Sequence, residues 1–455
     1  MARLFGTDGI RGVAGKDLTG HFAFRLGEAV GELLRENGWE QRLLIGRDTR
    51  ISGPMLEDAL GAGAMSTGCD VHVMGVVPTP VVAFITRHFE YPLGCVISAS
   101  HNPIEDNGIK FFDSRGMKVE DEIEERLEEL LEPDAFERRD VTGGNVGVRH
   151  EESKSVDVYA MHLSDIAQDR LLGLKMVIDG AFGAASVIAP SVFRLLGADT
   201  IPLNCTPDGS RINVNCGATD TSGCREKVLE VGADMGVALD GDADRAILVD
   251  EKGNVVDGDQ VLAMWGLHLL STNGLPDNAV VGTVLSNKGL ELALEDAGGK
   301  LLRAPVGDKY VLREMVSNGC KIGGEQSGHL IFLDHQTTGD GILTALMVAL
   351  LMRETGKPLS ELGKLMTRFP QVQLNITVED KQAALGDSKV MSEIASLSDE
   401  MEKLRGRLLV RPSGTESVIR VMTEAPEEAV ARRLAEQAIE LFKGYSETGK
   451  ITEIR

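Results

Sequence analysis

The sequence predicts an α/β protein with three similar α/β domains, whose sheets are mixed but largely parallel, followed by a distinct α+β C-terminal domain. The main observation is a pattern that occurs three times: an apolar strand, a glycine-containing loop, an amphipathic helix and a second strand. The second observation is that the C-terminal part follows a different order. The third is length, because 455 residues exceed what one hydrophobic core supports.

Each repeat is expected to form a βαβ unit, which joins neighbouring parallel strands and places helices on the faces of a sheet. The paired strands are predicted at 43–48 and 71–73, at 176–180 and 201–203, and at 279–283 and 301–303. The helices between them are predicted at Met55–Met65, Ala185–Leu196 and Lys288–Ala297.

A second shared pattern follows each repeat: a strand, a polar loop, and a strand that ends in an aspartate. The loops are 98–103, 240–245 and 323–329, and the aspartates are Asp113, Asp250 and Asp334. Because ligand sites favour domain interfaces, corresponding polar loops of three like domains predict a central cleft that the domains share.

The chain from about Pro370 has its own order. Strands are predicted at 372–378, 408–410 and 418–423, with a loop at 411–416 and a helix at 427–442. Polar, glycine-bearing stretches mark the junctions. The expected domains are 1–152, 153–254, 255–368 and 369–455.

Composition excludes several classes of protein. A net charge of −23 argues against nucleic-acid and anionic-membrane partners. The longest apolar run, Gly341–Met352, is too short to span a bilayer and predicts a buried helix. The N-terminus lacks the apolar segment of a signal peptide. Six cysteines without a Cys-x-x-Cys pair predict buried free thiols in a reducing cytoplasm.

The loop between the apolar runs around Val96 and Phe112 carries the first candidate chemistry. Ser100 can accept a phosphoryl group, His101 can donate hydrogen bonds to phosphate oxygens, and Lys110 returns toward the loop in the next strand. The alternative is an ordinary turn built from a Ser-Asn-Pro cluster.

Asp240, Asp242 and Asp244 stand at alternate positions, from which three carboxylates can converge on one hard divalent cation. A calcium EF-hand is rejected because its sixth position requires Gly and is Arg245 here, and because the flanks predict strands. A solvated cluster of surface carboxylates remains the alternative. Without a nearby His or Cys ligand, Mg²⁺ fits better than Zn²⁺.

Three aspartates with one Mg²⁺ leave a net charge of −1, to which a phosphoserine would add nearly −2. Stable coexistence therefore requires cationic groups close by. The candidates are Arg245, Lys110, His101 and Arg11.

Two further loops suit a phosphosugar. The segment Arg411–Glu416 with Arg420 predicts a receptor for a phosphate monoester, although a Ser/Gly turn with a structural arginine is the alternative. The segment Gly324–His329 supplies a carboxylate and a hydroxyl for sugar hydroxyl groups, with His329 as a proton donor. Neither a Walker loop nor a Gly-x-Ser-x-Gly elbow is present.

Five motifs in order resemble those of the α-D-phosphohexomutase superfamily over essentially the full length. They are Thr-Asp-Gly-Ile-Arg-Gly (7–12), Ser-Ala-Ser-His-Asn-Pro (98–103), Asp-Gly-Asp-Ala-Asp-Arg (240–245), Gly-Glu-Gln-Ser-Gly-His (324–329) and Arg-Pro-Ser-Gly-Thr-Glu (411–416). Segments 217–220, 306–311 and 337–341, together with Gln326, resemble the bacterial phosphoglucosamine mutases. Ala243 replaces a usual glycine, which matters only if its φ is positive, and Ser417 replaces a usual proline.

The resemblance implies roles residue by residue. Ser100 would be the phosphoserine, and its phosphate would hold one Mg²⁺ per chain together with Asp240, Asp242 and Asp244. The other residues matched to the site are Arg11, His101 and Lys110 around the phosphate (Lys110 as a general base), Arg245 near the metal, Glu325 and Ser327 on the sugar, His329 as acid or base, and Arg411, Ser413, Gly414, Thr415 and Arg420 as a phosphate clamp.

The activity that the resemblance implies is an isomerase, an intramolecular phosphotransferase. It would interconvert glucosamine 6-phosphate and glucosamine 1-phosphate through a 1,6-bisphosphate, and so supply UDP-N-acetylglucosamine and peptidoglycan precursors. A hexose 1,6-bisphosphate activator, a homodimer and a cytoplasmic location are implied as well. The alternatives are a phosphomannomutase/phosphoglucomutase on the same scaffold, a non-catalytic sugar-phosphate-binding protein and a simple phosphatase.

Overall fold

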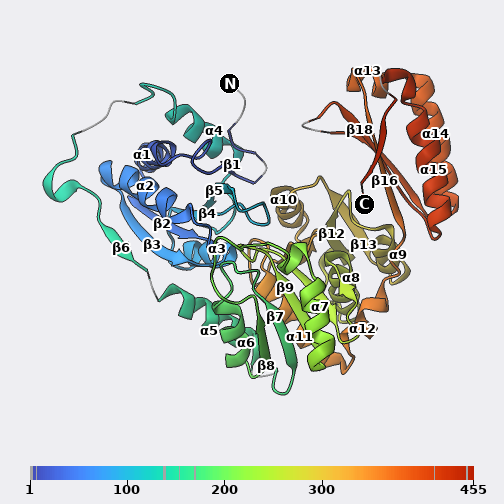
Figure 1. Ribbon diagram of the computed structural model, residues 1–455, viewed down its shortest axis with the longest axis horizontal. Helices are drawn as coiled ribbons and strands as arrows, with labels where there is room; N and C mark the ends of the chain where they lie inside the picture. Colours follow the sequence, from blue (N-terminus) through green and yellow to red (C-terminus); the bar gives the residue numbers. More distant parts are fainter. Residues whose placement is uncertain are drawn as a thin grey trace. The chain divides into compact units, whose positions relative to one another are not determined.

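A computed structural model describes residues 4–6, 8–136, 140–152, 154–168, 171–413, 416–446 and 449–454. The chain divides into two compact units (Figure 1). The first contains residues 1–285 and 298–365, and the second contains residues 286–297 and 366–455.

Three sheets of the first unit contain the same four-stranded arrangement. In each, the two strands of the predicted repeat are parallel, a third strand pairs in parallel with the first, and a fourth returns antiparallel. The predicted mixed, largely parallel sheets are therefore confirmed. The antiparallel return is what makes each polar loop a tight connection between adjacent strands.

The strand order of the first sheet is β1-β5-β4-β2-β3-β6, that of the second is β11-β10-β9-β7-β8, and that of the third is β13-β12-β14-β15. Their bounds are β1 Ile10–Val13, β2 Arg42–Arg47, β3 Asp70–Val76, β4 Leu93–Ile97, β5 Asp106–Asp113, β6 Arg149–Glu151, β7 Lys175–Asp179, β8 Asp199–Leu203, β9 Met235–Leu239, β10 Ala246–Asp250, β11 Val255–Val256, β12 Ala279–Thr283, β13 Lys300–Ala304, β14 Ile322–Gly324 and β15 Leu330–Phe332.

The helices of the first unit are α1 Gly20–Glu36, α2 Gly53–Ser66, α3 Thr79–His88, α4 Asp121–Leu130, α5 Ser155–Ala167, α6 Ile188–Leu195, α7 Ser222–Val231, α8 Gly258–Ser271, α10 Asp308–Asn318, α11 Gly341–Thr355 and α12 Leu359–Leu362. The repeat helices are confirmed, but α6 begins at Ile188 rather than at Ala185. The strand β15 ends at Phe332, before Asp334, so the third repeat departs from the predicted pattern there.

Both faces of the first sheet are covered. Residues of α1, α2 and α4 form one core with alternate residues of β2, β3 and β4, as the two-residue side-chain period of a strand requires. Helix α3 approaches so closely that a Cβ at Gly94 would lie 2.0 Å from Oγ1 of Thr86. This leaves the loops at the strand ends as the accessible polar surface.

The predicted buried helix at Gly341–Met352 is confirmed as α11. Asp340 caps its first turn by accepting a hydrogen bond from the backbone N–H of Leu343, and Gly356 ends it with a left-handed φ of 66°. Of the cysteines, five are buried and free as predicted, whereas Cys205 is only half-buried. Among the described residues, no helix is long and apolar enough to cross a membrane.

The second unit contains the α+β C-terminal region, with an antiparallel sheet in the order β17-β18-β16-β19. Its elements are α9 Lys288–Asp296, β16 Gln371–Thr377, α13 Lys381–Gly386, α14 Ser388–Lys403, β17 Arg407–Pro412, β18 Val418–Glu424, α15 Glu428–Glu440 and β19 Ile451–Ile454. One prediction needs correction, because Arg411 and Pro412 belong to β17 and not to a loop. Three elements, α13, α14 and β19, were not predicted.

Candidate active site

Ser100 lies in the connection between β4 and β5, and its side chain is buried (1% exposed). Its Oγ donates a hydrogen bond to Oδ2 of Asp240 at 2.7 Å and lies 3.2 Å from Nδ1 of His101. Its φ is 52°, a left-handed conformation that residues with a side chain seldom adopt. The structure therefore brings the candidate nucleophile and the acidic loop together.

The aspartates of the acidic loop converge after β9. Asp240, Asp242 and Asp244 are buried, and one ligand oxygen from each lies within 4.8 Å of the others. Among the described residues, Oδ1 of Asp242 and Oδ1 of Asp244 are buried and accept no hydrogen bond. Oδ1 of Asp244 has one ionic neighbour, Nε of Arg245 at 3.8 Å. Buried carboxylate oxygens without hydrogen bonds are costly, and a hard cation such as Mg²⁺ would satisfy them. The loop thus fits a metal ion, and the surface-cluster alternative is wrong.

Ala243, within this loop, has a φ of 56°. The departure from the usual glycine therefore falls on a position that needs a left-handed backbone, where a Cβ is unfavourable.

Charge in this cluster is unevenly distributed. Burial and the neighbouring Asp244 and Asp242 raise the pKa of Asp240 well above its ordinary value. Burial opposes ionisation of Asp244 too, but Lys110 and His329 hold its pKa well below the usual range. Three adjacent carboxylates therefore do not all ionise easily unless a cation joins them.

Lys110, in β5, is the main protein cation beside the cluster. Its Nζ lies 3.0 Å from Oδ2 of Asp242 and 3.5 Å from Oδ2 of Asp244. Although burial opposes its charge, Asp242 and Asp8 raise the pKa of Lys110. In this state Lys110 is an ammonium group that donates hydrogen bonds, so the general-base role implied by the resemblance would require it to lose a proton first.

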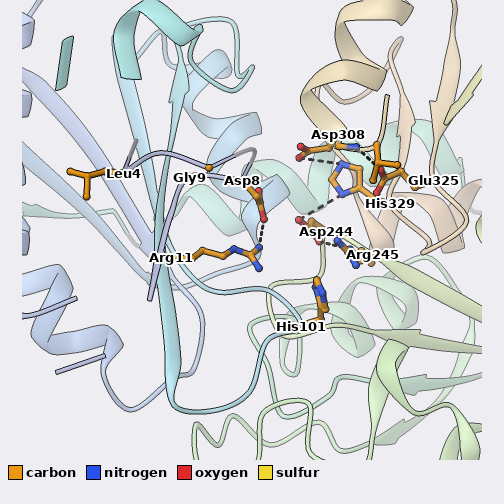
Figure 2. Close-up of a pocket in the computed structure, with 13 residues that line it drawn as sticks. Leu4, Asp8, Gly9, Arg11, His101, Asp244, Arg245, Asp308, Glu325 and His329 are labelled. Carbon is orange, nitrogen blue, oxygen red and sulfur yellow. Dashed lines mark hydrogen bonds and ion pairs between the residues drawn. The ribbon is translucent and has the colours of Figure 1, made fainter. Parts of the chain in front are cut away.

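A pocket of about 440 Å³ opens beside the cluster. Figure 2 shows Arg11 and Asp8 on one wall, His329, Asp308 and Glu325 on another, and Asp244, Arg245 and His101 between them. It is lined by Leu4, Gly6, Asp8, Gly9, Arg11, His101, Asp244, Arg245, Val306, Gly307, Asp308, Glu325 and His329. The volume is that of a small-molecule site, and the lining comes from all three domains predicted for the first unit.

Two arginines face this pocket with unused donors. Among the described residues, Nε of Arg11 and Nε of Arg245 are buried without a hydrogen-bond partner. Arg11 also donates to Oδ1 of Asn102 at 2.8 Å and pairs with Asp8. Burial, together with Arg245 and Arg11, lowers the pKa of His101 to about 4. His101 is therefore neutral near pH 7, and the arginines supply the positive charge for an anion.

Three residues of this region were not predicted as site residues. Lys118 bridges Asp8 and Asp308, with Nζ 2.6 Å from Oδ2 of Asp308. Asp8 and Asp308 lie inside segments 7–12 and 306–311, which were singled out only as motifs. Lys118 had no sequence signal, because only folding brings it between two acidic residues far away in the chain.

The sugar-binding candidates divide into two groups. Glu325 lines the pocket and accepts a hydrogen bond from the backbone N–H of Gly307 at 3.0 Å. Ser327 is exposed, with Oγ 3.4 Å from Oε2 of Glu325, and does not line the pocket. The side chain of Gln326 points to Oδ2 of Asp257 at 3.3 Å and likewise does not line it.

His329 is buried at the back of the pocket. The backbone N–H of Gly339 donates to its Nε2 at 3.0 Å, which places the ring proton on Nδ1, 3.7 Å from Oδ2 of Asp244. Asp244 raises the pKa of His329 in spite of burial. A proton on Nε2, however, would set two donors against each other at Gly339, so we assign the neutral ring to this state.

The phosphate loop belongs to the second unit. Arg411 and Arg420 are direct cross-strand partners in β17 and β18, and each is half-buried. Burial and Arg420 lower the pKa of Arg411. Like charges directly opposite each other are unfavourable in a sheet, and Arg420 is already offset in part by Glu416, whose Oε2 lies 3.1 Å from Nη2. An anion bound between the two arginines would relieve the remaining repulsion. Gly414 and Thr415 lie outside the described residues.

Two other contacts shape this loop. Nη2 of Arg420 lies 3.4 Å from Oγ of Ser413, and its Nε is buried without a partner among the described residues. Lys381, which was not predicted, donates to the carbonyl oxygens of Ser413 at 2.7 Å and Glu416 at 2.8 Å. Lys381 lies at the start of α13, more than 30 residues before the phosphate loop, so no local sequence pattern connects it to that loop.

Four family models match the chain in order. They are described as Phosphoglucomutase/phosphomannomutase, alpha/beta/alpha domain I (residues 2–138), domain II (157–253), domain III (257–369) and the C-terminal domain (374–441). The phosphoglucosamine mutase of Thermoanaerobacter sp. (strain X514) is 48% identical over 445 residues, which cover 97% of this chain and 99% of that protein. The chain belongs to the phosphoglucosamine mutase family. It is therefore a phosphohexomutase, an isomerase that transfers a phosphoryl group.

A second relative supports this assignment, and two solved structures share the fold. The phosphoglucosamine mutase of Desulforamulus reducens is 46% identical over 97% of this chain and 99% of that protein. A phosphoglucomutase/phosphomannomutase family protein from Burkholderia thailandensis has a similar structure, with a TM-score of 0.84, 25% identity and 99% of each chain covered. The N-acetylphosphoglucosamine mutase of Aspergillus fumigatus, solved with GlcNAc-6P and magnesium, shares the fold at a TM-score of 0.68, with 17% identity and coverage of 97% of this chain and 96% of that one.

Proposed function

We propose that this enzyme interconverts glucosamine 6-phosphate and glucosamine 1-phosphate through a phosphoserine at Ser100 and a glucosamine 1,6-bisphosphate. The observation that carries the proposal is the hydrogen bond from Oγ of Ser100 to Asp240, within the buried cluster of three aspartates. A serine hydroxyl at a metal-binding cluster beside an arginine-lined pocket suits phosphoryl transfer, which depends on positioning and charge neutralisation.

The first transfer joins O1 of glucosamine 6-phosphate to the phosphorus of phosphoserine 100. The bond from phosphorus to Oγ breaks, the proton on O1 passes to a basic group of the pocket, and Oγ regains a proton. The bisphosphate then presents its 6-phosphate, which Oγ attacks as it gives up its proton to a basic group of the pocket. The bond from phosphorus to O6 breaks, O6 takes up a proton, and glucosamine 1-phosphate leaves while the phosphoserine is restored.

Asp240, Asp242 and Asp244, with the phosphate of Ser100, would hold the Mg²⁺ ion. When bound, it offsets the negative charge of the phosphoryl group, a role for which oxygen-only ligands suit it. A phosphorylated Oγ has no proton to donate to Asp240, so the serine ester and the carboxylates would otherwise repel each other.

The remaining residues act on the ends of the substrate. Arg11 and Arg245 bind the transferring phosphate with their unused Nε donors, while Lys110 and His101 line its approach. Glu325 accepts hydrogen bonds from sugar hydroxyl groups, and Ser327 lies beside it. His329 acts as the acid or base, with its proton on Nδ1 beside Asp244. Arg411, Ser413, Gly414, Thr415 and Arg420 clamp the phosphate that is not transferred.

The domain boundaries, the cellular location, the pathway role, the activator and the oligomeric state are part of the same proposal. The domain boundaries are those predicted from the sequence, at residues 152, 254 and 368. The enzyme works in the cytoplasm, for which the free cysteines are the support. It supplies precursors for UDP-N-acetylglucosamine, responds to a hexose 1,6-bisphosphate activator and forms a homodimer, as the family resemblance suggests.

A substrate panel with purified, phosphorylated enzyme tests the function. We expect kcat/KM for glucosamine 1-phosphate to exceed that for glucose 1-phosphate and mannose 1-phosphate. Equal or reversed values would favour the phosphomannomutase/phosphoglucomutase alternative. Release of inorganic phosphate in place of isomerised sugar would indicate a phosphatase.

The phosphoserine is tested separately by Ser100→Ala, with Ser114→Ala in an exposed turn as the matched control. Ser100→Ala removes the nucleophile, so we expect turnover to fall by at least about 10³-fold and the phosphate adduct in the intact-protein mass to disappear. Undiminished turnover of Ser100→Ala would end the phosphoenzyme mechanism. If Ser100→Ala loses turnover but the wild type carries no phosphate adduct, a group other than Ser100 accepts the phosphoryl group.

A further inference from the structure

The backbone carbonyl of Ser100 is held from two sides. Nη2 of Arg50 donates to it at 3.0 Å, and Nδ2 of Asn213 donates to it at 2.9 Å. Arg50 follows β2, whereas Asn213 belongs to the segment before α7, so the donors come from different domains. Neither residue lies in any of the motifs that mark the family.

Arg50 is fully buried, and its guanidinium donates mainly to backbone oxygens of the loop that carries Ser100. Besides Ser100, it donates to the carbonyl oxygens of Asn102 at 2.8 Å and Asp106 at 2.9 Å, and to that of Pro103. Its Nε pairs with Oδ2 of Asp48 at 3.0 Å. An arginine with all its donors on backbone oxygens and one carboxylate shapes a loop and has none left for a substrate.

The other side of the Ser100 backbone is fixed through the same network. The N–H of Ser100 donates to Oγ of Ser98 at 2.9 Å, and that hydroxyl donates to Asp48 at 2.6 Å. Both peptide groups that flank Ser100 are therefore anchored. The anchored conformation has a φ of 52°, which a serine leaves readily unless its surroundings hold it there.

The metal loop packs closely against this carbonyl group at Gly241. A Cβ at Gly241 would lie 2.7 Å from the carbonyl oxygen of Ser100 and 2.8 Å from Nδ2 of Asn213. If the peptide after Ser100 rotated, its buried carbonyl would lose both donors, which is unfavourable in a buried site. The direction of the Ser100 side chain thus depends on these two donors.

We propose that Arg50 and Asn213 are positioning residues that hold Ser100 in its left-handed conformation through its carbonyl oxygen, and so direct Oγ toward the aspartate cluster. The inference rests on the proposed function, in which Oγ carries the transferred phosphoryl group. Neither residue touches the substrate. Their effect falls on the transfer step and leaves substrate binding by the other loops unchanged.

Asn213→Ala tests the proposal, with Asn215→Ala as the matched control, because Asn215 is exposed on the same segment and also has a positive φ. In the full-length phosphorylated enzyme with Mg²⁺, we expect kcat of Asn213→Ala to fall about tenfold or more, since small misplacements of reacting groups are costly. KM should change by less than about twofold, because the sugar and phosphate contacts remain. The ³¹P NMR resonance of phosphoserine 100 should shift or broaden, and Asn215→Ala should match the wild type throughout.

A wild-type kcat or an unchanged ³¹P resonance in Asn213→Ala would overturn the inference, as would a loss confined to KM. Arg50→Lys and Arg50→Met extend the test. Lysine keeps the charge and part of the hydrogen bonding, so kcat should fall in the order wild type, Arg50→Lys, Arg50→Met, and any other order contradicts the proposal. If both Arg50 variants fail to fold, Asn213→Ala decides alone. If the wild-type enzyme shows no mutase turnover, the proposed function is refuted. If the wild type is active and Asn213→Ala has the same kcat, only this inference is refuted.

Discussion

The two polar centres of this enzyme, one in each compact unit, have opposite charge and different exposure. Around Ser100, the aspartates are buried, at 0% exposure for Asp240 and Asp242, and Lys110 is the main cation in contact with them. In the second unit, Arg411 and Arg420 face each other across two strands and are half-buried. Among the described residues, no hydrogen bond or ion pair engages the guanidinium of Arg411.

The two centres are suited to ligands of opposite charge. A buried group of carboxylates, two of whose oxygens accept no hydrogen bond, suits a cation, whereas a pair of opposed arginines suits an anion. The first centre is enclosed and hydrogen-bonded in advance, as a site of bond breaking requires. The second is open, as a site that binds and releases one phosphate requires. Loss of a group should therefore affect the rate at the first centre and substrate binding at the second.

The largest effect is expected from Asp242→Ala. This change removes one of the three carboxylates. It leaves the hydroxyl of Thr79, which donates to Asp242 at 2.6 Å, without that acceptor, and it leaves Lys110 with the more distant Asp244. We expect turnover to fall by about 10³-fold, together with Mg²⁺ binding measured by calorimetry, because metal charge stabilisation amounts to several kcal/mol. Asp234→Ala, an exposed aspartate just before β9, is the control. Full Mg²⁺ affinity in Asp242→Ala would remove Asp242 from the metal site.

Arg411→Ala tests the second centre. Loss of one charged partner of a phosphate should raise KM for the phosphosugar about 10- to 100-fold, with a smaller change in kcat. Arg432→Ala, on the exposed face of α15 where Arg432 pairs with Glu428 and Glu453, should leave both parameters unchanged. A fall in kcat at unchanged KM would mean that Arg411 acts on the transfer step, and the contrast between the centres would disappear.

The pH dependence of folding stability tests the charge state of His101 in the first centre. The pKa of His101 is about 4 in the folded protein, below the unfolded value of about 6.5. Between these values the unfolded chain binds the proton and the folded chain does not, so this residue lowers stability as the pH falls from 6.5 toward 4. The loss should be on the order of 1 kcal/mol, because His101 is partly exposed.

His101→Gln cannot titrate and removes this contribution. Between pH 7 and about pH 4.5, its urea unfolding midpoint should therefore fall less than that of the wild type. Parallel curves for the two proteins would show that His101 keeps an ordinary pKa in the folded state, contrary to its burial beside Arg245 and Arg11.

The smallest effect is expected from Ala243→Gly in the metal loop. Glycine relieves the left-handed strain at this position but gains freedom in the unfolded chain, so we expect a stabilisation of about 0.5 kcal/mol or less. Ala246→Gly, three residues later in β10, should destabilise by about 0.5–1 kcal/mol, because no strain is relieved there. Thermal unfolding measures both. Destabilisation of equal size in the two variants would show that the loop accommodates Ala243 without strain.

Much of the architecture could be predicted from local pattern. The three repeats, their parallel strands and the buried helix α11 follow from apolar periodicity, which acts over neighbouring residues and can be recognised along the chain. The convergence of Asp240, Asp242 and Asp244 was predictable for the same reason, because alternate side chains in one short loop cannot move far apart.

Contacts between distant segments could not be predicted in this way. The partners Ser100 and Asp240 are 140 residues apart, and Arg50, Asn213 and Lys118 carry no pattern of their own. Burial changes their chemistry as well: His101 becomes neutral because arginines from other segments surround it, and Lys110 stays charged because carboxylates do. The sequence thus determines the strands, the helices and the chemical type of each loop, since these depend on near neighbours. The pairing of loops, the charge state of each group and the backbone conformation at Ser100 depend on which distant atoms share a low-dielectric interior, and folding alone decides that.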